Sequence, residues 1–193
     1  MKKLLLFVAA SFLSAGIFAQ SFGVRAGVNI SNVTVKTQGF SIKPNAVAGI
    51  NAGIFLNFHL APAVSLQPEL AYSGMGYKVN NSGITGTETT SYLTLPLLLK
   101  VKVPTTGLGI YAGPQAGLLL SAKDKSQGQT EDAKDNYKST DFAGVAGLEY
   151  SFKLGLFFSA RYQFSLANVA STNQGQDAAV KNNCVSILVG IKL

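Results

Sequence analysis

Apolar and polar residues alternate along the segment Ala48–Leu60, and the same pattern recurs through the chain. Its even-numbered positions are all apolar, whereas its odd-numbered positions are mostly small or polar. A period of two residues is typical of a β-strand with one face in an apolar medium. At about 3.3 Å per residue, Ala48–Leu60 spans roughly 43 Å, which suits a tilted strand that crosses a bilayer.

The alternation predicts eight strands. They cover Phe22–Ser31, Ala48–Leu60, Val64–Tyr77, Thr89–Val103, Leu108–Ser121, Asp141–Phe152, Leu156–Ala167 and Cys184–Leu193. Short turns and long polar links strictly alternate between them. An antiparallel meander of this kind is the layout of an eight-stranded transmembrane β-barrel of the bacterial outer membrane, with short periplasmic turns and longer extracellular loops. Because hydrocarbon offers no hydrogen-bond partners, such an all-β sheet has to close on itself.

Two local expectations concern irregular positions. Pro68 lacks a backbone N–H, so we expect a defect in the strand ladder there, in the form of a β-bulge. The longest polar link, Ala122–Thr140, contains four lysines, three aspartates and one glutamate, and we expect it to contribute nothing to a core. Its acids lack the ordered spacing of a calcium-binding loop, which favours a solvated loop.

A soluble, lipocalin-like barrel would have the same number of strands, so the choice depends on which face lies outside. The apolar face carries no charged residue in any predicted strand, as contact with lipid requires. The opposite face is rich in glycine, which suits the crowded lumen of a small barrel.

Aromatic residues of the apolar face gather near the two ends of the predicted strands. The periplasmic group is Phe22, Phe58, Tyr150, Phe152 and Phe158, and the outer group is Tyr72, Phe142 and Phe164. Two such groups are typical of the aromatic girdles that mark the two membrane interfaces. This pattern favours the membrane barrel over the soluble one.

Residues 1–19 have the features of a secretory signal peptide. Lys2 and Lys3 precede a single long apolar run that ends at Ala19. Cleavage after Ala19 would leave residues 20–193 as one outer-membrane β-barrel domain, exported through the periplasm to the cell outer membrane. The lone Cys184 excludes an internal disulfide, and the mild positive charge forms no basic cluster that would indicate nucleic-acid binding.

Seven charged residues fall on the predicted inward face. They are Arg25, Glu69, Lys100, Lys102, Glu149, Arg161 and Lys192. Buried charges have to be paired, so we expect an internal charge network in which the two glutamates accept hydrogen bonds from the bases and which plugs the lumen. An ion path or a catalytic acid pair is the functional alternative, but a barrel of eight strands is too narrow for an aqueous channel.

No catalytic, cofactor or metal site is expected. His59 is the only histidine and lies beside a predicted periplasmic turn, whereas an outer-membrane lipid hydrolase or acyltransferase would need a His and Ser pair near the outer rim. His59 and Cys184 alone do not make a metal-ligand cluster. We therefore expect that the protein is not an enzyme and uses no cofactor.

Five segments together resemble the PorT-type outer-membrane β-barrel family of Bacteroidota. They are FGVRAGVNISNV at Phe22–Val33, LQPELAYSGMGY at Leu66–Tyr77, YLTLPLLLKV at Tyr92–Val101, IYAGPQAGLLLS at Ile110–Ser121 and SARYQFSLANV at Ser159–Val169. The similarity covers essentially the whole mature chain, and the order and spacing of the segments make it specific. The resemblance implies an integral outer-membrane protein, surrounded by outer-membrane lipid and inserted by the barrel-assembly machinery.

The expected role is structural or adhesive. Binding residues concentrate on loops that a rigid scaffold holds, so the four outer loops are the expected contact surface for an extracellular partner that the sequence does not identify. Three alternatives stay open: a secreted soluble ligand-binding barrel, a lipid-modifying outer-membrane enzyme, and an accessory component of a secretion system. Charge on the outward face would favour the first, and a His and Ser pair at the outer rim would favour the second.

Overall fold

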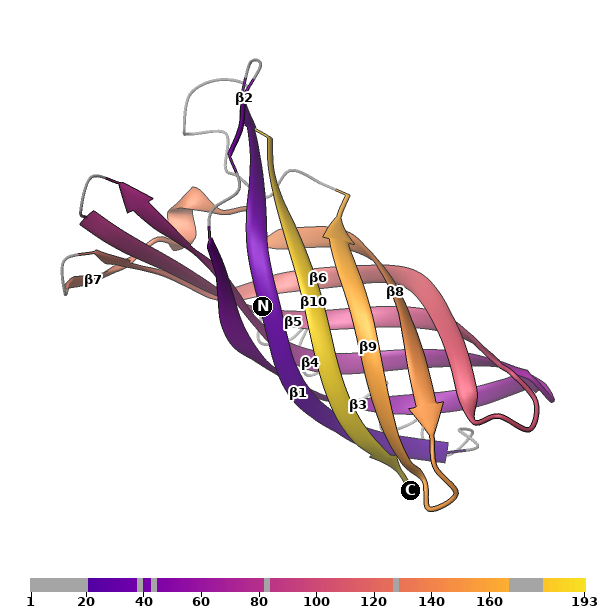
Figure 1. The fold of residues 1–193 in the computed structure, drawn as a ribbon. Coiled ribbons are helices and arrows are strands. Elements are labelled where there is room, and N and C mark those ends of the chain that lie inside the picture. Colours follow the sequence, from indigo (N-terminus) through magenta and orange to yellow (C-terminus); the bar gives the residue numbers. More distant parts are fainter. Residues whose placement is uncertain (1–20, 38–39, 43–44, 82–83, 127–128, 167–178) are drawn as a thin grey trace.

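Eight long antiparallel strands form a closed ring in the computed structural model, which describes residues 21–37, 40–42, 45–81, 84–126, 129–166 and 179–193 (Figure 1). The ring strands are β1 (Ser21–Thr37), β3 (Asn45–Ala61), β4 (Val64–Asn81), β5 (Ile84–Lys102), β6 (Leu108–Ser126), β8 (Thr140–Ser151), β9 (Leu156–Ser165) and β10 (Ala179–Lys192). Strands β2 (Phe40–Ile42) and β7 (Gln129–Asp132) pair with β1 and β6, and a 3-10 turn, η1 (Lys134–Asn136), follows β7. The predicted signal peptide, residues 1–19, lies outside the described residues.

The ring closes between its first and last strands. β10 pairs with β1 from Gly23↔Lys192 to Lys36↔Ala179, and every other ring strand pairs with its neighbours in the chain. Closure gives each ring strand two hydrogen-bonded neighbours, as a sheet in hydrocarbon requires. The predicted eight-stranded antiparallel barrel is therefore confirmed.

The apolar face of each strand lies outside. In β1, Val28 and Ile30 are each 50% exposed, whereas Asn29 between them is fully buried. The same alternation of exposed apolar and buried inward residues runs through β9, from Leu156 to Ser165. This is the reverse of a soluble barrel, in which the apolar face fills the interior. No helix in the described part of the chain is long and apolar enough to span a membrane.

Three short turns join strands at one end of the barrel, where β1 begins and the chain ends (Figure 1). They connect β3 with β4, β5 with β6, and β8 with β9. Gly107 and Gly155 adopt φ values of 74° and 81° in the second and third turns, a conformation that glycine tolerates without steric cost. These three turns therefore determine which strands are joined in pairs at this end of the barrel.

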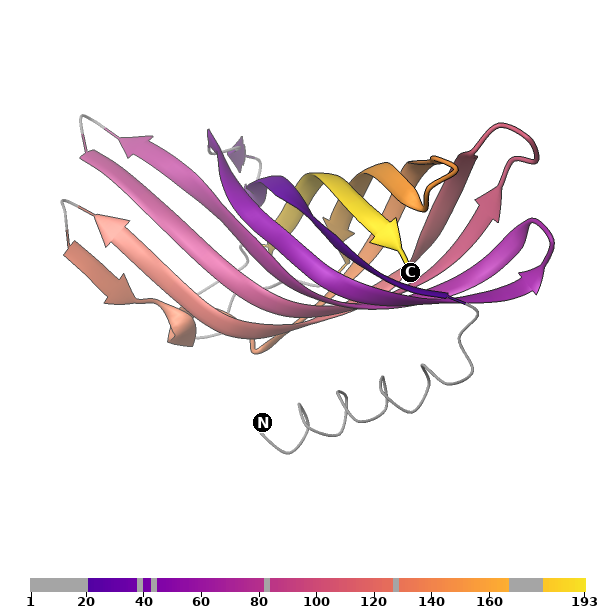
Figure 2. The ribbon, with the colours of Figure 1, turned by 90° about the horizontal axis from the view of Figure 1, so that it is seen from below.

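At the opposite end, β4, β5, β6 and β7 project beyond the neighbouring strands (Figure 2). Strand pairing continues as far as Asn81↔Ile84 between β4 and β5, and as far as Ser126↔Gln129 between β6 and β7. We call this four-stranded projection the outer platform. The polar links predicted here are thus too long, because the hydrogen-bonded ladders continue into them.

The expectation that Ala122–Thr140 contributes nothing to a core is wrong. Ala122 and Ala133 are buried against Tyr92 and Leu119, and Tyr137 packs on this cluster. The cause is an irregular step in the pairing of β6 with β5, where Tyr92 pairs with Leu119 but Ser91 pairs with Ser121. Leu120 is the extra residue, so Ala122 returns to the inward face.

The bulge predicted at Pro68 is also absent. Pairing continues in one register from Phe55↔Glu69 to Phe58↔Leu66 on one side and from Pro68↔Leu97 to Ala71↔Thr94 on the other. Proline removes one backbone donor but adds no residue to the strand, so the flanking pairs keep the register.

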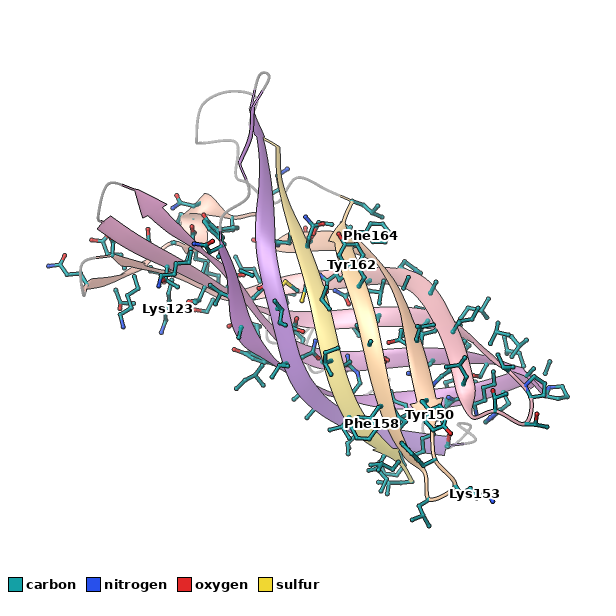
Figure 3. All side chains as sticks on the ribbon, in the orientation of Figure 1. Lys123, Tyr150, Lys153, Phe158, Tyr162 and Phe164 are labelled. Carbon is teal, nitrogen blue, oxygen red and sulfur yellow. The ribbon has the colours of Figure 1, made fainter. Side chains whose placement is uncertain are left out.

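Outward aromatic residues gather at both ends of the barrel wall (Figure 3). Near the short turns, Phe152 contacts Tyr150 and Phe158 edge to face, with ring centroids 5.0 and 5.9 Å apart. Toward the other end, Tyr162 stacks on Phe164 at 6.1 Å. Tyr162 therefore belongs to the outer group in addition to the predicted members Tyr72, Phe142 and Phe164. Lys153 in the β8–β9 turn lies beyond the first group (Figure 3).

Candidate functional site

The lumen of the barrel holds most of the buried charge. Glu69 on β4 is fully buried and accepts hydrogen bonds from two arginines on other strands. Arg25 Nη2 lies 2.8 Å from Glu69 Oε2, and Arg161 donates to both carboxylate oxygens, at 2.9 and 3.1 Å. Arg25 also donates to Oδ1 of Asn51 at 2.7 Å. We call Arg25, Glu69 and Arg161 the arginine group.

A second group lies closer to the short turns. Glu149 on β8 accepts hydrogen bonds from Lys100 on β5 and from Lys192 on β10, the latter at 2.7 Å. The ring of Phe157 lies beneath both lysines, with its centroid 5.8 Å from Lys100 Nζ and 5.1 Å from Lys192 Nζ. We call Lys100, Glu149 and Lys192 the lysine group. Each glutamate therefore has two bases as partners.

Gln67 connects the two groups. Its Nε2 donates to Glu69 Oε1 at 2.8 Å, and its Oε1 accepts from Lys100 Nζ at 3.2 Å. Gln67 lies two residues before Glu69 in the predicted strand Val64–Tyr77, so the alternation places it on the same inward face but does not identify its partners. Six of the seven inward charges thus fall into two groups of ion pairs, and the neutral side chain of Gln67 joins the groups. Lys102, the seventh inward charge, is half-buried and forms no ion pair with a described residue.

Neutral polar residues continue the network toward the outer end. Asn29 is fully buried, donates to Ser73 Oγ at 2.9 Å and accepts from Asn51 at 3.0 Å and from Ser186 at 2.7 Å. Further out, Asp141 accepts hydrogen bonds from Ser165. Asp141 directly follows the acidic link Ala122–Thr140 in the sequence, but its side chain is buried in the lumen.

Inward aromatic rings lie across from glycines on the adjacent strand. Phe55 pairs with Gly23, Phe157 pairs with Gly190, and a Cβ on either glycine would lie 2.3 Å from the ring of its partner. The two rings also meet edge to face, with centroids 5.6 Å apart. Since Gly23 lies on β1 and Gly190 on β10, the two rings cover the place where the barrel closes.

The lumen is thus a packed interior of paired charges, amides, hydroxyls and rings. Within the part of the chain that the structure describes, no group of three or more His, Cys, Asp or Glu side chains could hold a metal ion. His59 lies exposed at the end of β3, next to the short turn. Cys184 is buried in the lumen.

The fold resembles solved outer-membrane proteins. The crystal structure of Neisserial surface protein A superposes with a TM-score of 0.59 and 13% identity, covering 89% of this chain and 97% of that one. Ail, the attachment invasion locus protein of Yersinia pestis, superposes with a TM-score of 0.52 and 18% identity, covering 90% and 98%. A second structure of Ail, in complex with the heparin analogue sucrose octasulfate, gives a TM-score of 0.51 at 18% identity, covering 90% and 99%. At these identities the likeness concerns the fold alone.

A search of curated protein sequences gives no match. The family model described as outer membrane protein beta-barrel domain matches residues 18–171, which is most of the chain. The match agrees with the closed ring, the apolar outer surface and the polar lumen. The chain belongs to the outer membrane protein beta-barrel domain family and is an integral β-barrel of the outer membrane, in contact with its lipid.

Proposed function

We propose that the protein is a non-enzymatic surface-interaction barrel, and that the outer platform is its contact surface. The observation that carries this proposal is the regular, hydrogen-bonded structure of the outer platform. β4–β7 extend the barrel wall as paired strands, and the buried cluster of Tyr92, Leu119, Ala122 and Ala133 supports their base. A projecting sheet of fixed shape loses little entropy on binding, which is what a contact surface requires.

Two observations support the non-enzymatic part of the proposal. The only histidine, His59, lies at the end with the short turns, far along the barrel from the projecting strands. The lumen is occupied by the arginine and lysine groups, and an interior filled in this way supports a scaffold more than a channel.

Finer assignments belong to the same proposal. We place the chain in the PorT-type branch of the family in Bacteroidota because of the five segments quoted above. We further propose that residues 1–19 are removed as a signal peptide and that the barrel-assembly machinery inserts the remainder. The accessory role in secretion remains an alternative, but no observation on the described residues favours it over the contact surface.

The test compares bacteria that display the intact barrel with bacteria that display a trimmed one. Lys78 and Thr87 face each other on β4 and β5, so residues 79–86 can be replaced by Asn-Gly, which closes a two-residue hairpin. Adhesion is counted on surfaces coated with collagen, fibronectin or heparin. Heparin is included because one Ail structure holds a heparin analogue.

The expected result is adhesion of the intact barrel to at least one coating and a several-fold loss on trimming. Both proteins should shift on a gel only after boiling, which shows that trimming leaves the barrel folded. Equal adhesion of intact, trimmed and barrel-free cells on every coating would overturn the proposal.

A further inference from the structure

The inward face of the outer platform is acidic. Tyr77, Glu88, Asp124 and Glu131 lie opposite one another across β4, β5, β6 and β7, and residues directly opposite in antiparallel strands share a face. Tyr77 donates a hydrogen bond to Glu88. Along β6, two residues before Asp124, Ala122 lies on the same face and is buried in the lumen. The three acids therefore line the continuation of the barrel interior.

The outward face of the same platform carries lysines. One row runs Gly76, Thr89, Lys123 and Asp132, and the next runs Lys78, Thr87, Lys125 and Thr130. All three lysines are exposed. The single acid of these rows, Asp132, accepts a hydrogen bond from the backbone N–H of Lys134 at 2.9 Å. Lys78, Lys123 and Lys125 thus outnumber the single acid on this face and make it positive, and we call these three residues the lysine stripe.

The lysine stripe lies on the same face as the lipid-facing surface and extends it toward the outer end of the barrel. Below it on the same face lie Ser91 and the aromatic residue Tyr72, whose hydroxyl is 2.7 Å from Ser91 Oγ. The rows of Lys123 and Lys125 are four and six residues beyond Tyr72 along β4. At about 3.3 Å per residue and a tilt of roughly 35–45°, the lysines stand about 10–16 Å above the aromatic girdle. Figure 3 shows Lys123 on the projection, well away from Tyr150 and Phe158 at the other end.

At this height the lysines lie beyond the hydrocarbon core, within reach of large headgroups of the outer leaflet. Long outer loops place this end of the barrel outside the cell, where the outer leaflet consists of lipopolysaccharide. Its phosphorylated sugars lie directly above the hydrocarbon, and lysines close to an anionic lipid surface are attracted to it. Solubility alone would be served equally by mixed charges on both faces. Separation of the signs, with the lysines toward the leaflet and the acids away from it, matches an anionic lipid.

We propose that Lys78, Lys123 and Lys125 bind the phosphate groups of lipopolysaccharide molecules that surround the barrel. The contact is a lateral one, made by the outer wall of the platform. It is independent of the partner that the platform tip contacts, so either proposal can fail without the other.

The test uses the chain purified in folded form from outer membranes into a zwitterionic detergent. Lipopolysaccharide is titrated in, and binding is followed by the rise in the temperature at which the folded gel band disappears. Parallel titrations use dephosphorylated lipopolysaccharide and inorganic phosphate at the same phosphate concentration. Only intact lipopolysaccharide should stabilise the barrel, and high salt should weaken the effect.

Three variants locate the binding face. Lys123→Gln with Lys125→Gln should weaken lipopolysaccharide binding by about fivefold for each lysine removed. Lys125→Ser with Ser126→Lys keeps the net charge but moves one lysine to the inward face, and it should weaken binding as much as Lys125→Gln alone. Lys153→Gln, in the turn at the other end, should leave binding unchanged.

Equal binding by the wild type and the Lys123 and Lys125 double variant would overturn the proposal. So would equal stabilisation by dephosphorylated lipopolysaccharide, or by inorganic phosphate, which would show that no phosphorylated lipid is recognised. A gel band that shifts only on boiling in each variant establishes that a loss of binding is not a loss of folding.

Discussion

Gln67 donates a 2.8 Å hydrogen bond to Glu69, and through this contact the lysine group reaches the arginine group. The other end of the Gln67 amide accepts from Lys100 at 3.2 Å. Buried ionic groups that share a neutral bridge depend on one another, because each partner satisfies a donor or acceptor that water does not reach.

Replacing Glu69 by alanine should destabilise the barrel severely. The change leaves Arg25 and Arg161 buried without their shared carboxylate, and loss of one partner of a buried ion pair costs roughly 3–5 kcal/mol. The measurement is urea unfolding of the refolded chain in lipid vesicles. Glu131→Ala removes an exposed carboxylate from β7 and should change the free energy of unfolding by less than about 0.5 kcal/mol. Equal stability of the two variants would show that the arginine group does not stabilise the fold.

Gln67→Leu should cost less than Glu69→Ala, at roughly 1–3 kcal/mol, because it removes the hydrogen bonds of a neutral side chain to Glu69 and Lys100 but leaves all four ion pairs of the two groups in place. Gln67→Leu and Lys100→Met are then combined in a double-mutant cycle. If Gln67 connects the groups, the double variant should lose less than the sum of the single losses. Strict additivity would argue against the bridge.

Gly190→Ala should destabilise the barrel by about 1–3 kcal/mol through overpacking. The new Cβ would lie 2.3 Å from the Phe157 ring and 2.6 Å from the carbonyl oxygen of Val24. Gly86→Ala is the matched control, because nothing lies within 4 Å of its Cβ position. Adding Phe157→Leu should restore part of the loss. A Gly190→Ala variant as stable as Gly86→Ala would contradict the close approach of the ring.

The lone cysteine should be unreactive in the folded barrel. Cys184 is 1% exposed in the lumen, so a water-soluble maleimide should label it only after boiling in detergent. In a Cys184→Ser background, Ile187→Cys on the outer wall should react with a lipid-soluble maleimide and not with a water-soluble one. Ser186→Cys, one position earlier and buried, should react with neither. Labelling of both positions by the water-soluble reagent would mean that the wall does not face lipid.

The orientation in the membrane can be read from two exposed lysines. In the same background, Lys123→Cys should be labelled on intact cells by an impermeant maleimide, because it lies on the outer platform. Lys153→Cys, in a short turn, should be labelled only after the cells are broken. The opposite result would invert the barrel and, with it, the proposed contact of the lysine stripe.

The faces and the closed barrel were predictable from the sequence, but the strand ends were not. Between Val28 and Asn29, the step from half exposed to fully buried follows directly from the alternation of residue types. Above the membrane both faces of a strand meet polar surroundings, so the alternation of apolar residues ends. The hydrogen-bonded ladder nevertheless continues, as the pair Lys78↔Thr87 shows.

Which side chains become partners inside the lumen depends on the register between strands. The pattern of apolar and polar residues along the chain does not specify that register. Glu69 and Arg161 are 92 residues apart and come together only through the relative shift of several strands. For the same reason the alternation places Gln67 on the inward face without showing that it connects the two groups, and it does not reveal that Leu120 is an extra residue. Polarity at an inward position predicts that a partner exists, while strand register decides which one it is.

The contact between Phe55 and Phe157 bears on how the barrel completes its assembly. β1 and β10 come from opposite ends of the chain, so their pairing carries the largest loop-closure cost and is expected to form last. In the native pairing, a ring from each flanking strand lies over a glycine and the two rings touch. A slip of β10 by two residues along β9 would set Leu188 or Lys192 against Phe157 in place of Gly190. The two rings then meet in only one register of β1 and β10. This aromatic pair therefore favours the correctly closed barrel over barrels that close with shifted strand pairing.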